Sequence, residues 1–189
     1  MMQTKEAGIA AKSIYWGVAR LLDSSFLIAA TNEGLIYLQY QEGDAEQGTA
    51  DEEDAWSELT KLARNHFPDY SWTEEQALLE PYVQQLEEYL QGLRKTFTLP
   101  LDLRGTAFQQ NVWRALNEIP HGETVSYSQI AQKLDKASAV RAVGTAIGAN
   151  PVLIVVPCHR VVGKNGALTG YRGGLVNKKK LLVLEKAIL

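Results

Sequence analysis

The chain has 189 residues, 46% of them hydrophobic and 22% charged, a composition typical of a globular protein with one large domain or two small ones. No run approaches the roughly 20 apolar residues of a membrane span, and the first residues lack the features of a signal peptide, so we expect neither a membrane-embedded nor a secreted protein. A single cysteine cannot form an internal disulfide, which fits a reducing compartment, and we expect a cytoplasmic protein.

The net charge of −3 combines two halves of opposite sign. Residues 1–102 carry 7 basic and 18 acidic side chains, a net of −11, whereas residues 103–189 carry 12 basic and 4 acidic ones, a net of +8. A basic half is typical of a domain that binds a polyanion such as nucleic acid. A chain that only balances its own charge explains the asymmetry equally well.

In chain order, residues 13–40 alternate short apolar runs with turn residues, which predicts a small antiparallel sheet of hairpins. Residues 41–55 are acidic and nearly free of large apolar side chains, so we expect an exposed loop. Apolar residues at helical spacing predict helices over 56–66 and 74–92, the second ended by a glycine. The extended, proline-containing stretch 97–105 is interpreted as the passage to a second domain.

The second half has a different pattern. Helical spacing and a capping threonine predict a helix over 106–117. Two short helices follow over 126–134 and 137–148, separated by a brief turn, in the arrangement of a helix-turn-helix. The apolar run 151–156 is predicted as a strand, and a basic amphipathic helix over 176–189 is predicted to close the chain. We divide the chain into domains of residues 1–102 and 103–189.

Cys158 is the candidate reactive residue. It follows an apolar run and Pro157, which has no N–H and turns the chain out of a strand. A lone cysteine is commonly a small buried hydrophobic residue, but His159 and Arg160 follow it directly, and both favour a thiolate if they face it. The signatures of papain-like and caspase-like cysteine proteases are absent.

Six segments around this cysteine resemble the O6-alkylguanine-DNA alkyltransferase family, and they occur in the same order: TAFQQNVWRAL, IPHGETVSYSQIA, RAVGTAIGANP, PCHRVVG, GALTGYRGGL and KKKLLVLE. The resemblance covers about residues 104–186. It implies an α+β fold: an N-terminal ribonuclease-H-like α/β domain, followed by a mainly helical C-terminal domain with a winged-helix-like helix-turn-helix.

The resemblance also implies roles in catalysis. Cys158 is the expected alkyl acceptor, since a thiolate is the best side-chain nucleophile for an alkyl carbon. His159 is the expected base, acting through a water molecule, and Glu185 the carboxylate that orients it. Tyr127 is expected to hydrogen-bond the flipped guanine, and Asn150 to lock the turn before the active-site segment. Without the resemblance, Glu185 reads as a solvated charge and Tyr127 as a core aromatic residue.

The implied partner is duplex DNA containing O6-alkylguanine, bound through its minor groove with the damaged base flipped out. Arg141 is expected to fill the vacated place in the duplex, on a helix made slim by small residues, although small residues also allow close packing in a core. Tyr171 and Arg172 lie in a loop that resembles the family's binding-pocket wall. Lys178 resembles a lysine near that pocket, and a solvated lysine on the helix surface is an equal alternative. The expected DNA-binding residues are Ser126, Tyr127, Ala139, Arg141, Ala142, Tyr171 and Arg172.

The expected reaction is a single turnover, because transfer to sulfur makes a thioether and the chain has no second cysteine to cleave it. We expect no cofactor and no metal, and we expect a monomer. Three alternatives stay open: a sensor of alkylated DNA without transfer, a DNA-binding regulator, and a thiol-based redox sensor. A sensor is disfavoured because the cysteine is present in the PCHR motif.

Overall fold

The computed structural model describes residues 12–41 and 55–188. The N-terminal domain is built on three antiparallel strands joined by two-residue turns: β1 (Ser13–Leu21), β2 (Ser24–Thr31) and β3 (Gly34–Tyr40). The predicted hairpins are therefore confirmed. A short edge strand, β4 (Ser71–Glu74), pairs in parallel with β1 and gives the sheet order β3-β2-β1-β4.

Helices cover both faces of this sheet. Helix α1 (Ala55–His66) packs on one face, where Leu59 joins a core with Leu27. Helix α2 (Glu80–Leu90) belongs to the other core, which also contains Phe26 and Ile28 and continues into the C-terminal domain. Neighbouring residues of β2 thus point to opposite cores, as the pleat of a strand requires. This double coverage explains why the central run of β2, residues 26–30, is apolar and buried throughout.

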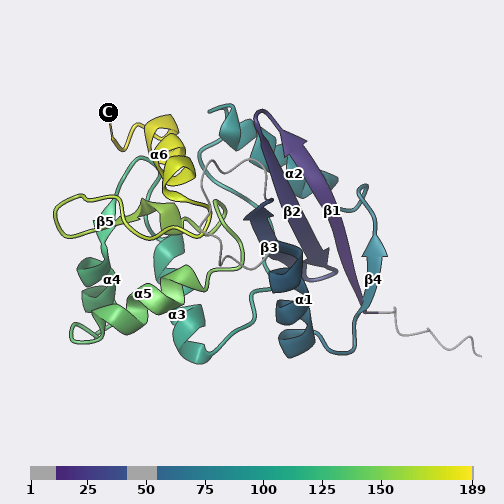
Figure 1. The fold of residues 1–189 in the computed structure, drawn as a ribbon, viewed down its shortest axis with the longest axis horizontal. Helices are drawn as coiled ribbons and strands as arrows, with labels where there is room; N and C mark the ends of the chain where they lie inside the picture. Colours follow the sequence, from purple (N-terminus) through teal and green to yellow (C-terminus); the bar gives the residue numbers. More distant parts are fainter. Residues whose placement is uncertain (1–11, 42–54, 189) are drawn as a thin grey trace, which may run out of the picture.

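The C-terminal domain is mainly helical and lies beside the sheet domain (Figure 1). Capping boxes open both α3 and α4, through Thr106 with Gln109 and Ser126 with Gln129. Helices α4 and α5 pack against each other in the predicted helix-turn-helix. The helices are α3 (Ala107–Asn117), α4 (Tyr127–Lys133), α5 (Val140–Gly148) and α6 (Leu175–Leu184), and the short elements are β5 (Val125–Ser126), η1 (Cys158–Arg160) and β6 (Val161–Val162).

Strand β3 joins the two domains. Its Leu38 donates its N–H to the carbonyl of Pro151 and accepts from the N–H of Leu153, both at 2.9 Å. On the same strand, the N–H of Leu35 donates to the carbonyl of Pro100 in the segment that links the domains. The backbone leading to Cys158 is therefore held directly by the N-terminal sheet.

The prediction of a strand over residues 151–156 is wrong. Only an isolated bridge from Val152 to Leu38 forms, and the chain then turns. Ile154 has a φ of 68°, a left-handed conformation that costs a β-branched residue about 1–3 kcal/mol. The segment is apolar because it is buried, not because it forms a strand.

Two predicted helices are shorter than expected. The pattern over 74–92 yields a helix only from Glu80, because Pro81 fits the first turn and the residues before it form β4 and a turn. Gly92, with a φ of 75°, ends this helix as predicted. The last helix, predicted over 176–189, ends at Leu184, and it is less amphipathic than expected because Asn177 and Lys178 are buried.

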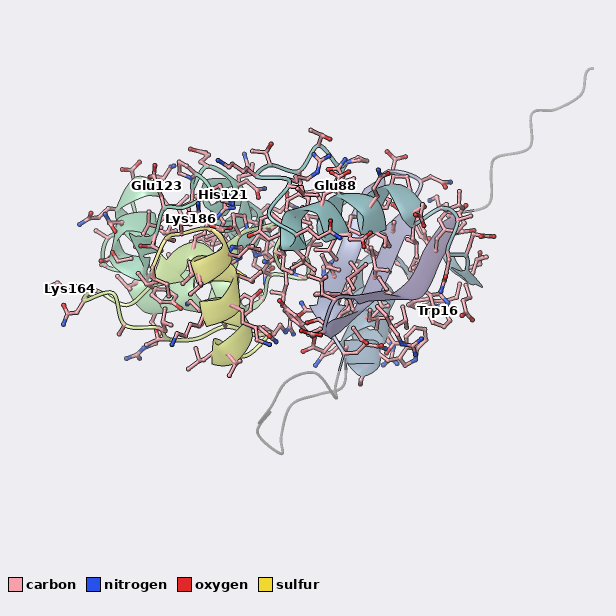
Figure 2. The ribbon with its side chains drawn as sticks, turned by 90° about the horizontal axis from the view of Figure 1, so that it is seen from above. Trp16, Glu88, His121, Glu123, Lys164 and Lys186 are labelled. Carbon is pink, nitrogen blue, oxygen red and sulfur yellow. The ribbon has the colours of Figure 1, made fainter. Side chains whose placement is uncertain are left out.

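Seen from above, Trp16 and Glu88 lie on the sheet domain, and Lys164 projects at the opposite end of the molecule (Figure 2). The predicted acidic loop over 41–55 falls almost wholly outside the described residues. Within residues 12–41 and 55–188, no helix has the length and apolarity needed to cross a membrane.

Candidate active site

Cys158 lies in the short turn η1, between the segment held by β3 and the small strand β6. It is a free cysteine with 4% of its surface exposed. Its neighbour Pro157 precedes the turn, so the sulfur follows the largely buried, apolar stretch 152–156. The sequence predicts that Cys158 follows a buried apolar run, although that run over 151–156 forms turns and not the expected strand.

Asn150 fixes the turn that contains the sulfur. Its side-chain amide donates to the carbonyl of Val156 at 2.9 Å and to Sγ of Cys158 at 3.1 Å. Its side-chain oxygen accepts from the N–H of Val152 at 3.0 Å, and its backbone carbonyl accepts from the side chain of Gln39 in β3 at 3.2 Å. The fully buried Asn150 thus ties the cysteine to its own turn and to the N-terminal sheet.

The Cys158 thiol is protonated at neutral pH. Burial raises its pKa to about 11, and the hydrogen bond from Asn150 and the positive charges of Lys178 and Arg172 only partly oppose this effect. Since the thiolate is the nucleophilic form, reaction at neutral pH requires a base that removes the proton.

His159 and Glu185 form a fully buried pair, with Nε2 of His159 2.9 Å from Oε1 of Glu185. Burial lowers the pKa of His159, and Glu185 partly restores it. The neutral ring therefore donates from Nε2 to the carboxylate and keeps a lone pair on Nδ1. Nδ1 is buried and has no hydrogen-bond partner among the described residues, so it is available to take a proton.

Glu185 follows the last turn of α6 and receives further donors. Arg160 donates to both carboxylate oxygens at 2.9 to 3.2 Å, and its other nitrogen donates to the carbonyl of Ile119 at 2.6 Å. The N–H of Gly122 donates to Oε2 at 3.1 Å. Burial alone would raise the pKa of Glu185, but the hydrogen bonds from His159 and Arg160 hold it well below its usual range.

From the sequence, Arg160 could face Cys158 and favour its thiolate. In the structure its guanidinium group instead pairs with the buried Glu185 and neutralises that carboxylate. Tyr89 of α2 also donates its hydroxyl to Glu185, a contact that local sequence patterns do not reveal because the two residues are 96 positions apart.

Cys158 lines a pocket of about 280 Å³. Tyr127, at the start of α4, lines it and donates its hydroxyl to the carbonyl of Thr169 at 3.1 Å. Three of the expected site residues, Cys158, Tyr171 and Arg172, meet Tyr127 here. The lining residues are Tyr127, Gly144, Ile147, Gly148, Cys158, Gly170, Tyr171 and Arg172.

Lys178 is fully buried rather than a solvated helix lysine. Its Nζ donates to the carbonyls of Val161 at 2.5 Å and Thr169 at 2.7 Å. Burial lowers its pKa to about 8. Lys178 therefore braces the loop that forms the pocket wall.

The pocket wall also touches the N-terminal domain. Arg172 pairs with Glu58 of α1 at 2.5 Å. The Tyr171 hydroxyl is buried and has no hydrogen-bond partner among the described residues. A Cβ on Gly173 would lie 2.7 Å from the rings of Tyr171 and of Tyr40 in β3, so glycine allows this close packing.

Helix α5 presents a narrow exposed surface beside the pocket. Arg141 and Ala142 are exposed and Ala139 is half-buried, whereas Val143 faces the core. Small residues therefore occur both on the exposed face of this helix and on the face that packs in the core, so both explanations considered from the sequence apply. The hydroxyl of Ser126 accepts the cap hydrogen bond of α4. In the described parts of the chain, no three histidine, cysteine or carboxylate side chains gather to hold a metal ion.

Two family models match the chain. The ribonuclease-like domain of 6-O-methylguanine DNA methyltransferase matches residues 14–103, and the DNA-binding domain of the same proteins matches residues 107–187. Together they account for most of the chain.

Similar proteins carry the same names. The inducible methylated-DNA–protein-cysteine methyltransferase of Bacillus subtilis is 50% identical over 92% of this chain and 91% of its own. A Mycobacterium tuberculosis O6-methylguanine methyltransferase structure is 38% identical, with a TM-score of 0.71 over 92% of this chain and 93% of its own. Another structure, of M. tuberculosis OGT in complex with DNA, has the same identity and TM-score over 92% of each chain. This chain belongs to the methylated-DNA–protein-cysteine methyltransferase family.

Proposed function

We propose that this protein repairs DNA by direct reversal, by moving an alkyl group from O6 of guanine to Sγ of Cys158. The observation that carries the proposal is the set of groups at and behind the pocket wall. Cys158 lines the pocket with a buried thiol, and the next residue in the chain is His159, whose Nδ1 has no hydrogen-bond partner among the described residues and whose Nε2 is held by the buried carboxylate of Glu185. The names of the relatives support the same reaction.

In the proposed reaction, Nδ1 of His159 takes the thiol proton through a bridging water molecule. The new Sγ–carbon bond forms as the carbon–O6 bond breaks, and its electron pair goes to the guanine. Glu185 stabilises the imidazolium, and the Tyr127 hydroxyl stabilises the charge that develops on the base. The proton finally returns to guanine, so the products are unmodified guanine and a thioether. Because the thioether is stable, each chain acts once.

The proposed substrate is a flipped base in duplex DNA. An O6 atom paired inside the duplex cannot reach a sulfur in the pocket wall, so the nucleotide must leave the stack. The slim α5 helix fits the narrow minor groove, and the exposed Arg141 would occupy the place of the flipped base. We propose a monomer acting in the cytoplasm, where reducing conditions keep the single thiol available.

The test is the intact-protein mass after incubation with duplex DNA that carries O6-methylguanine, followed by peptide mapping. We expect a gain of one methyl group per chain on the peptide containing Cys158, and no gain for Cys158→Ala. Tight binding of the lesion without a mass gain would contradict transfer and support a sensor. A mass gain from peroxide but not from alkylated DNA would support a redox sensor.

A further inference from the structure

Tyr89 connects the N-terminal domain to the buried histidine–carboxylate pair. It lies near the end of α2 and is fully buried, with its ring centroid 5.1 Å from that of Phe97. Its hydroxyl donates to Oε1 of Glu185 and lies 3.4 Å from Nε2 of His159. One side chain from the sheet domain therefore reaches both members of the pair.

Tyr89 can act only as a donor in this contact. Burial, and then the negative charge of Glu185, raise the pKa of Tyr89 far above its usual value. The tyrosine thus stays protonated, while Glu185 is held as a carboxylate without a proton of its own. The direction of the hydrogen bond is fixed across the domain boundary.

The contact determines how the carboxylate faces the histidine. Oε1 receives Tyr89, Nε2 of His159 and Nη2 of Arg160, whereas Oε2 receives Gly122 and Nε of Arg160. These donors on both oxygens prevent the carboxylate from turning. His159 consequently keeps its Nε2–H on Oε1, which leaves Nδ1 as its proton acceptor.

We propose that Tyr89 is a positioning residue for alkyl transfer, supplied by the N-terminal domain: it holds Glu185 so that His159 presents Nδ1 as the base. The inference rests on the proposed function. It gives the sheet domain a defined part in the chemistry, in addition to its packing against the active-site segment through β3.

The test is Tyr89→Phe, which keeps the ring and removes only the hydroxyl. We expect its single-turnover rate constant to fall about tenfold or more, since a well-held histidine base contributes roughly 10²- to 10⁴-fold. With one donor fewer, the carboxylate stabilises the imidazolium more strongly, so the acid limb of the rate–pH profile moves to higher pH. The final yield stays at one alkyl group per chain.

The matched control is Tyr82→Phe, on the same helix but only half-buried, which should retain the wild-type rate and profile. A Tyr89→Phe profile identical to the wild type would overturn the inference. A reduced final yield with an unchanged rate constant would also overturn it, because that result indicates only a loss of folded protein. If the wild type itself transfers no alkyl group, the proposed function fails and the inference with it, so the two failures are distinguishable.

Discussion

Tyr127 and Lys178 share one acceptor: the Tyr127 hydroxyl and the Lys178 ammonium group donate to the carbonyl of Thr169, at 3.1 and 2.7 Å. The tyrosine that is proposed to bind guanine therefore starts with its hydroxyl on the pocket wall. When it turns toward a base, Lys178 still satisfies the carbonyl. The buried lysine thus lets Tyr127 leave without creating an unpaired polar atom.

Replacement of this lysine should destabilise the fold. Lys178→Met keeps most of the side-chain volume but removes the ammonium donor from the carbonyls of Val161 and Thr169, and leaves Thr169 only its hydrogen bond from Tyr127. We expect a loss of about 2–4 kcal/mol in the free energy of unfolding, measured by urea titration. Lys179→Met, exposed on the same helix, should change it by less than about 0.5 kcal/mol. Equal effects of the two substitutions would contradict the bracing role.

Asn150→Asp should slow alkyl transfer strongly. The substitution removes the amide donor from Sγ of Cys158 and from the carbonyl of Val156, and an ionised aspartate would oppose formation of the thiolate. We expect the single-turnover rate constant to fall about 100-fold or more, within the range expected when charge stabilisation in an active site is lost. Asn117→Asp, at the exposed end of α3, is the control. An unchanged rate for Asn150→Asp would refute the role of the amide.

The Cys158 thiol should make stability depend on alkaline pH. Its pKa rises from 9.0 to about 11 on folding, so the unfolded chain releases this proton first. The stabilising contribution is therefore complete below pH 9 and is lost as the pH rises from 9 to 11. Relative to Cys158→Ala, the wild type should lose on the order of 2–3 kcal/mol across this window. Chemical denaturation at several pH values checks this, and a constant difference between the two proteins would disprove it.

Arg172→Ser should change the preference for alkyl size. Arg172 lines the pocket and is held by Glu58, so a smaller residue widens the space available to the transferred group. We expect the rate with O6-benzylguanine in DNA to rise severalfold relative to the rate with O6-methylguanine. Glu58→Gln, which keeps the arginine and weakens its anchor, should give a smaller change in the same direction. A ratio that stays constant in both variants would count against a role in selectivity.

Arg141→Ala should affect duplex DNA selectively. If the exposed arginine occupies the place of the flipped base, its removal makes unstacking less favourable by about 1.4 kcal/mol or more, and we expect the rate on duplex DNA to fall about tenfold or more. The rate with the free O6-methylguanine base should not change, because no flipping is needed. Arg20→Ala, exposed on β1, serves as the control. An equal loss with the free base would contradict the proposed role.

Local sequence signals predicted many of the elements correctly. The hairpins, α1, α3 and the helix-turn-helix were predicted because each has a clear period and clear turns or caps. The strand over 151–156 was wrong because burial alone makes a segment apolar, whatever its backbone conformation. Strand β4 was missed because its four residues are all exposed and show no apolar alternation.

The site was predicted less evenly. The motifs selected Cys158, His159 and Glu185 together with Asn150, and the structure places Asn150 against Cys158 and His159 against Glu185. The contacts that cross between the domains, such as that of Tyr89, could not be predicted from local patterns because they depend on how the two domains pack. Nor did the helical pattern reveal that Lys178 is buried, since one lysine among three looks like its neighbours.

The close packing of Gly173 against Tyr40 restricts which substitutions can be inherited at these two positions. A Cβ at position 173 would lie 2.7 Å from the rings of both Tyr40 and Tyr171, so a larger residue there is tolerated only if the residue at position 40 becomes smaller and the Tyr171 ring also moves or shrinks. The same exchange would move the pocket wall relative to the sheet. Among descendants of this chain, positions 40 and 173 should therefore change together. A change in the shape of the pocket wall should then be accompanied by a substitution in β3 of the N-terminal domain.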